Sequence, residues 1–155
     1  MITIESKYDF PSALIERAAN AALTHHASRE SVDVNLSVVL TDNRRLRKLN
    51  RDYLGIDAPT DVLSFPASES DGSEIDPETG ARYIGDILIS VPYARNGARQ
   101  AGNSLEAELQ LLVVHGVLHL LGHDHAKPKE KSKMWKAQRA ILIELGLDDV
   151  VIREE

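Results

Sequence analysis

The chain has 155 residues, of which 43% are apolar and 27% are charged, with a formal net charge of −6. This composition is typical of a globular protein, and the lack of cysteine excludes a disulfide scaffold, a thiolate metal site and a cysteine nucleophile. The sequence shows neither a signal-peptide pattern nor an apolar run of ~18 residues. We therefore expect a cytoplasmic protein without a membrane span.

The first half of the chain predicts two strands that alternate with two helices. Residues 1–8 begin with alternating isoleucines, and residues 32–40 carry Val or Leu at every second position, as half-buried strands do. Residues 12–27 are rich in Ala and Leu with one apolar face, which predicts an amphipathic helix. A second helix should follow the second strand, because Thr41 or Asp42 can cap it.

The second half of the chain predicts two more strands and three helices. The expected elements are a short strand at 62–65, a loop at 67–80, a strand at 83–91, a short helix opened by Pro92, and helices at 105–121 and 128–145. Asn103 or Ser104 can cap the first long helix, and Gly122 is placed to end it. This mixture predicts one α+β domain, residues 1–155, with a small mixed sheet of about four strands and helices packed on it.

Four of the six histidines lie within residues 115–125, HGVLHLLGHDH. On a helix, His115 and His119 share one face and lie about 6 Å apart along the axis. Burying two imidazoles in this apolar helix is costly unless a ligand such as a metal satisfies them. Gly122 allows a sharp turn, after which His125 can supply a third nitrogen. Three neutral nitrogens suit one Zn²⁺ ion with an open fourth position, and other divalent transition metals accept the same ligands.

This spacing matches the long zincin motif H-E-x-x-H-x-x-G-x-x-H, with Gly116 in place of the glutamate base. A glycine cannot take a proton from water, so a peptidase would lack its main catalytic residue while the zincin-like metal-binding helix survives. A Lewis-acidic metal with an open position still predicts a hydrolase.

Other interpretations of these histidines stay open. They could be core and loop residues without a metal, or His123 could complete a closed structural site. We interpret Asp124 as an acceptor that orients a ligand imidazole, with a general base or a turn residue as alternatives. As catalytic base, Asp124 is the candidate nearest in sequence, and Asp86 and Ser64 are further candidates.

Basic residues gather in two short stretches despite the net negative charge. If the segment 57–66 lies beside the metal, the first stretch could line a groove for a polyanion such as RNA, and a solvated helix face is the alternative. With 5% aromatic residues, base stacking is not an expected binding mode. The first stretch comprises Arg44, Arg45, Arg47, Lys48 and Arg51, and the second comprises Lys127, Lys129, Lys131, Lys133, Lys136 and Arg139.

The histidine motif resembles the H-G-x-L-H-L-x-G-x-D-H signature of the YbeY endoribonucleases. Three further segments resemble other marks of that family in the same order, and the resemblance covers about residues 40–146. These segments are Asn50-Arg51-Asp52-Tyr53, then Asp57 with Pro59-Thr60-Asp61-Val62-Leu63-Ser64-Phe65-Pro66, and Gly85-Asp86-Ile87. Two departures stand out: Leu54 replaces an arginine present in many members, and His123 replaces an aromatic residue.

The resemblance implies a metal-dependent endoribonuclease of the single-strand type, with one zinc-type ion on His115, His119 and His125. It also implies a role in 3′ end maturation of small-subunit ribosomal RNA and in ribosome quality control, with small ribosomal subunit components as partners. Two alternatives remain. One is a zinc-dependent peptidase or other metallohydrolase, and the other is a non-catalytic ribosome-assembly factor with a structural zinc.

Overall fold

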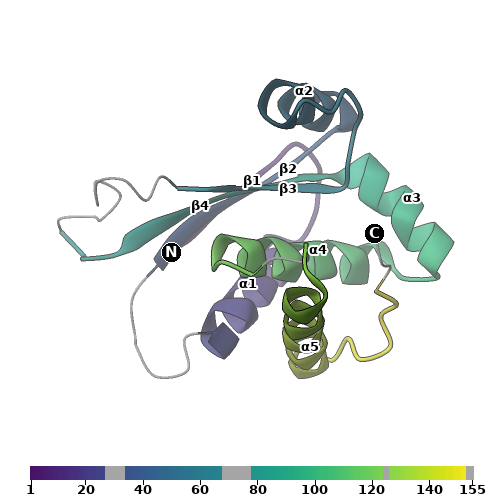
Figure 1. Cartoon of the computed structure of the whole chain (residues 1–155). Helices are drawn as coiled ribbons and strands as arrows, with labels where there is room; N and C mark the ends of the chain where they lie inside the picture. Colours follow the sequence, from purple (N-terminus) through teal and green to yellow (C-terminus); the bar gives the residue numbers. More distant parts are fainter. Residues whose placement is uncertain (27–33, 68–77, 124–125, 153–155) are drawn as a thin grey trace.

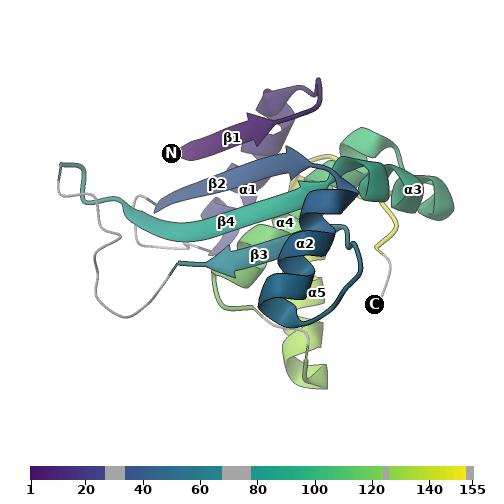
Figure 2. The ribbon, with the colours of Figure 1, turned by 90° about the horizontal axis from the view of Figure 1, so that it is seen from above.

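The computed structural model describes residues 1–26, 34–67, 78–123 and 126–152. In these residues four strands form one mixed sheet in the order β1-β2-β4-β3, which confirms the predicted α+β class. Strands β1, β2 and β4 are parallel, and β3 pairs antiparallel with β4 at the edge of the sheet (Figure 2). The strands are β1 (Ile2–Ser6), β2 (Val34–Thr41), β3 (Val62–Pro66) and β4 (Arg82–Ser90).

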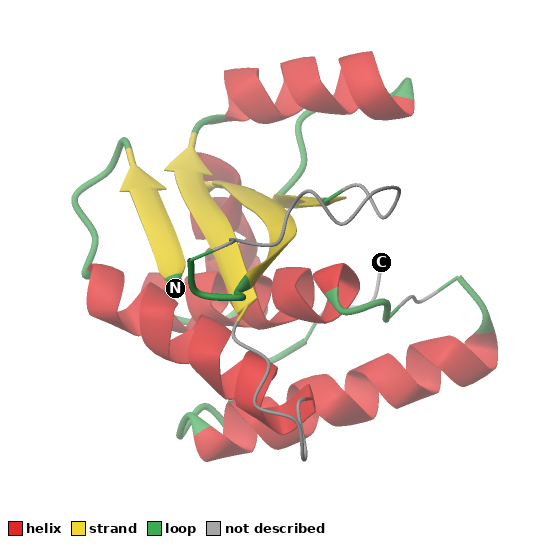
Figure 3. Cartoon of the chain, turned by 90° about the vertical axis from the view of Figure 1, so that its left-hand side faces the viewer, coloured by secondary structure: helices red, strands yellow, loops and turns green. Residues whose placement is uncertain are grey.

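Helices cover both faces of the sheet (Figures 1 and 3). One face carries α2, while α1, α4 and α5 lie on the other side, with α3 beyond the end of β4. Within the described residues, no helix combines the length and the apolar character needed to cross a bilayer. The helices are α1 (Ser12–His26), α2 (Asn43–Leu54), α3 (Val91–Ala101), α4 (Leu105–Leu120) and α5 (Pro128–Glu144).

Strand β4 contributes to the apolar packing on both sides of the sheet. Ile87 and Ile89 belong to the main core with α1, α4 and α5, whereas Leu88 joins a smaller cluster with Leu46 of α2 and Leu63 of β3. This division follows from the alternation of side chains along a strand. Because both faces of β4 are covered, apolar residues in 83–91 follow one another instead of alternating with polar ones.

The helix ends resolve the alternatives that the sequence left open. Asp42, not Thr41, caps α2 by accepting a hydrogen bond from Arg45 N at 3.0 Å. Ser104 caps α4 by accepting one from Ala107 N at 3.1 Å. Helix α3 begins at Val91, one residue before the expected Pro92, because Ser90 caps it. Most of the loop predicted at 67–80 lies outside the described residues.

Gly85 sits at an irregularity in the pairing of β2 with β4 and has a φ of +143°. A Cβ atom at this position would lie 2.3 Å from the carbonyl oxygen of Phe65 on the neighbouring strand. Only glycine therefore allows β3 to approach β4 here while the backbone keeps this conformation. The Gly85-Asp86-Ile87 segment thus fixes the position of β3, which forms part of the site described below.

Candidate metal centre

Helix α4 places His115 and His119 side by side, as their spacing predicted. The Nε2 atoms of the two half-buried imidazoles lie 3.1 Å apart. Two nitrogens of a tetrahedral zinc site are separated by about 3.3 Å, given Zn–N bonds of ~2.0–2.1 Å. The two side chains thus converge as two ligands of one divalent ion would. The donor set fits such an ion, since an imidazole in its neutral form can bind a divalent metal through Nε2.

Two residues predicted to complete the site, Asp124 and His125, lie outside the described residues. Across 1–26, 34–67, 78–123 and 126–152, no group of three His, Cys, Asp or Glu side chains is placed to hold a metal. Gly122, with a φ of +99°, ends the turn after α4, as predicted. The assignment of His125 as the third ligand stays a prediction.

Gln138 of α5 contacts the His115 imidazole at Nδ1, the ring nitrogen that does not face His119. Its side chain is fully buried, and its Oε1 atom lies 2.7 Å from Nδ1 of His115. An amide oxygen can only accept, so Nδ1 carries the proton and Nε2 presents its lone pair toward His119. Sequence analysis missed this residue. The available signal was a glutamine on the apolar face of α5, one turn from buried Met134 and Ile141.

A cavity of about 720 Å³ adjoins the two histidines. Its walls come from the 60–64 segment at the start of β3 and from α3, α4 and α5. The condition that sequence analysis set for this segment, a position beside the histidines, holds for residues 60–64. Asp61 and Ser64 both line this cavity, and the Ser64 hydroxyl lies 3.4 Å from the carbonyl oxygen of Gly116.

Asp61 is a carboxylate at the cavity wall that sequence analysis did not single out. It accepts hydrogen bonds from Val62 N at 2.7 Å and from the Thr60 hydroxyl at 3.4 Å. These contacts fix the carboxylate at the entrance to β3. The residue belongs to the Pro59-Thr60-Asp61 segment, so the motif contained the signal although its role was not assigned.

Asp86 is not brought to the histidines. Ile87 packs against Gly116 of α4, so the adjacent Asp86 faces the opposite side of the sheet, toward α2. There its carboxylate accepts a hydrogen bond from the Tyr83 hydroxyl. Burial, reinforced by this bond, raises the pKa of Tyr83. Asp86 thus stabilises β4 locally and does not line the cavity, whereas Ser64 does.

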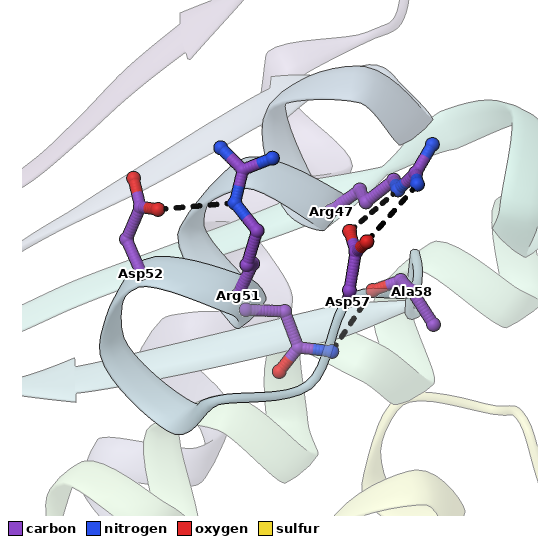
Figure 4. A network of polar contacts seen from close by, with 6 residues as sticks. Arg47, Arg51, Asp52, Asp57 and Ala58 are labelled. Atoms are coloured by element: carbon purple, nitrogen blue, oxygen red, sulfur yellow. Dashed lines mark hydrogen bonds and ion pairs between the residues drawn. The ribbon is translucent and has the colours of Figure 1, made fainter.

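Two of the basic residues of α2 pair with nearby carboxylates (Figure 4). Arg47 makes two hydrogen bonds to Asp57, at 2.8 and 3.2 Å, and Arg51 makes one to Asp52 at 3.2 Å. The Arg47 guanidinium holds the pKa of the Asp57 carboxyl below its usual range. Among the residues of α2, all of them described, Leu54 lines the cavity and the five cations proposed for RNA binding do not.

Gly116 faces the sheet, where the zincin motif would place its glutamate. A Cβ atom at Gly116 would lie 2.8 Å from Cγ2 of Ile87, which is fully buried in β4. A side chain there would overlap the Ile87 side chain unless that side chain or the helix shifted. Glycine at this position allows α4 to pack closely against the sheet and supplies no carboxylate base.

Comparison with known proteins decides the family. The sequence model of the family described as Endoribonuclease YbeY matches residues 1–146. The chain belongs to the YbeY family. Endoribonuclease YbeY of Brevibacillus brevis is 44% identical over 141 residues, which cover 86% of each chain. That of Geobacillus thermodenitrificans is 48% identical over 121 residues, covering 76% of each.

A solved structure has a similar fold over the whole length of this chain. The solution structure of TM1509 from Thermotoga maritima is 28% identical and matches with a TM-score of 0.59 over 100% of this chain and 99% of that one. The resemblance drawn from the histidine motif is thus confirmed. Of the two departures, exposed Leu54 lines the cavity, and His123 is half-buried directly after Gly122.

Proposed function

We propose that this protein is a zinc-dependent endoribonuclease that cuts single-stranded RNA in the cavity beside His115 and His119. One observation carries the proposal: in a chain of the YbeY family, two imidazole Nε2 atoms converge to 3.1 Å at the wall of a cavity of about 720 Å³. The relatives are named endoribonucleases, and this name favours RNA over peptide as the substrate.

In this proposal His115, His119 and His125 hold the ion. A divalent ion with an open position supplies a Lewis acid that polarises a phosphate and lowers the pKa of water. Gln138 keeps the proton of His115 on Nδ1, so Nε2 remains a ligand. Asp61 and Asp124 are the candidates for the residue that accepts the proton of the attacking hydroxyl. Asp61 is supported by its place in the cavity wall.

The reaction follows one of two routes, which differ in the attacking oxygen. If water attacks phosphorus, the product carries an ordinary terminal phosphate. If the 2′-hydroxyl of the RNA attacks, the product carries a 2′,3′-cyclic phosphate, and a deoxynucleotide at the cleavage site blocks the reaction. The ends of the product therefore identify the route.

The finer assignments rest on the family resemblance. They are maturation of the small-subunit ribosomal RNA 3′ end, ribosome quality control, small ribosomal subunit components as partners, and a cytoplasmic location. Nothing in the cavity favours the alternatives of a peptidase or of a purely structural zinc. Gly116 supplies no carboxylate at the position of the zincin glutamate, which argues against the peptidase.

The test compares zinc-loaded wild type with two histidine variants on a single-stranded RNA and on casein. We expect wild type and His25→Ala to cut the RNA, because His25 is exposed at the far end of α1. His119→Ala should keep the circular dichroism of the wild type and lose cleavage. RNA cleavage that survives in His119→Ala, or zinc-dependent digestion of casein without cleavage of RNA, would contradict the proposal.

A further inference from the structure

The cavity has an aromatic and cationic wall that the sequence did not predict. Lys131, Trp135 and Gln138 are spaced so that they share one face of α5, and all three line the cavity. The Trp135 ring lies 6.2 Å from the His115 ring, centroid to centroid, with 37° between the planes. An aromatic surface therefore stands directly beside the metal centre.

A second, shallower hollow of about 450 Å³ lies along the same helix. Lys131 and Trp135 line both hollows, so the two adjoin at these side chains. Lys136 and Arg139 add further positive charge to the second hollow. The Arg139 guanidinium also donates to the carbonyl oxygens of Asp148 and Val150, which fixes its position.

This combination matches the chemistry of single-stranded nucleic acid. Proteins bind single strands by tracking the phosphates with cations and by stacking bases on aromatic side chains. The cations of α2 do not line the cavity, and two of them, Arg47 and Arg51, pair with carboxylates. On α5, by contrast, Lys131 and the Trp135 indole line the cavity that His115 and His119 also line, and Lys136 and Arg139 line the second hollow next to these two side chains.

We propose that Lys131 and Trp135 form a nucleotide subsite beside the metal centre. A base of the RNA stacks on the Trp135 indole, its phosphate contacts the Lys131 ammonium, and the strand continues toward Lys136. This inference rests on the proposed function and deepens it, because it locates the strand on α5 rather than on α2.

The experiment uses the zinc-loaded protein and a short 2′-O-methyl RNA oligonucleotide, checked by gel to stay intact. The chain contains one tryptophan, so its fluorescence reports on Trp135 alone. We expect saturable quenching. Trp135→Leu should weaken binding roughly tenfold, as measured by the anisotropy of labelled oligonucleotide, while Trp135→Phe keeps most of the affinity.

Salt dependence tests the lysine. Lys131→Gln should reduce the slope of log affinity against log salt by about 0.7, the value expected for one lost phosphate contact on a single strand. Lys133→Gln is the matched control, because Lys133 is exposed on the same helix but lines neither hollow. Its slope should equal that of the wild type.

The outcomes separate the two proposals. No binding of the oligonucleotide to the wild type contradicts the proposed function itself. Binding with wild-type affinity in Trp135→Leu, or equal slopes for the two lysine variants, overturns the subsite alone. Equal quenching by a polyglutamate peptide also overturns it, because the site would then be selective for charge only. If Trp135→Leu does not fold, the subsite is tested by the fluorescence quenching of the wild type and by the salt slopes of Lys131→Gln and Lys133→Gln.

Discussion

The amide oxygen of Gln138 lies 2.7 Å from Nδ1 of His115, although the two residues are on different helices. This bond fixes both the tautomer and the orientation of a proposed metal ligand. We predict that Gln138→Leu, which has a similar volume but no acceptor, weakens zinc binding by about 10- to 100-fold. Competition with a chelating dye measures the change.

Gln138→Glu is the control for that experiment, because a carboxylate can accept the same hydrogen bond. Its zinc affinity should stay close to that of the wild type or exceed it. If Gln138→Leu and Gln138→Glu lose affinity equally, with unfolding temperatures near that of the wild type, Gln138 does not act through His115.

Gly116 and Ile87 test the packing of α4 against the sheet. Gly116→Ala should destabilise the protein by roughly 1–3 kcal/mol, because the added methyl group overlaps the buried Ile87 side chain. Ile87→Ala removes the side-chain atoms that the new methyl group would overlap. In a protein that already carries Ile87→Ala, Gly116→Ala should therefore lower the free energy of unfolding much less. Chemical denaturation of the four proteins in this cycle measures the coupling. Additive effects would show that the helix does not contact the strand as described.

Asp42 links the start of α2 to Lys7, the residue after β1, and this contact predicts a pH dependence of stability. It accepts hydrogen bonds from Lys7 Nζ at 2.5 Å and from Arg45 N at 3.0 Å. The side-chain bond from Lys7, followed by that from Arg45, lowers the pKa of the Asp42 carboxyl. The stabilisation is therefore fully present above the unfolded-state pKa of about 3.9 and is lost as the pH falls through the lower folded-state pKa.

The variant Asp42→Asn keeps a capping oxygen but removes the charge. Wild type should unfold at a higher temperature than this variant at neutral pH, by a few degrees, and the difference should shrink as the pH falls below 4 (about the unfolded-state pKa). A difference that stays constant down to acid pH would contradict the role of the Lys7–Asp42 pair.

Local signals in the sequence predicted the elements and the histidine pair. The i, i+4 spacing of His115 and His119 needs only a helix to bring the rings together, and α4 was predicted from its apolar run and its cap. Asp42 and Ser104 were among the predicted caps because capping depends on neighbouring backbone N–H groups. Such features are fixed within a few residues along the chain.

The missed features depend on packing between distant segments. Gln138 reaches His115 only because α5 packs on α4, and a glutamine on an apolar face does not by itself reveal its partner. Asp86 was a candidate base, but the face it occupies is decided by the side of the sheet that α4 covers. The sequence did not reveal that Arg47 pairs with Asp57, because the turn after α2 brings the two side chains together.

The amount of zinc bound per chain in single histidine variants tests the central claim most directly. We predict one ion per chain in the wild type and in His123→Ala, and loss of most of it in His115→Ala, His119→Ala and His125→Ala. Elemental analysis of the purified proteins measures it. Zinc retained by His119→Ala or His125→Ala, or lost from His123→Ala, would contradict a site of three imidazoles with one open position.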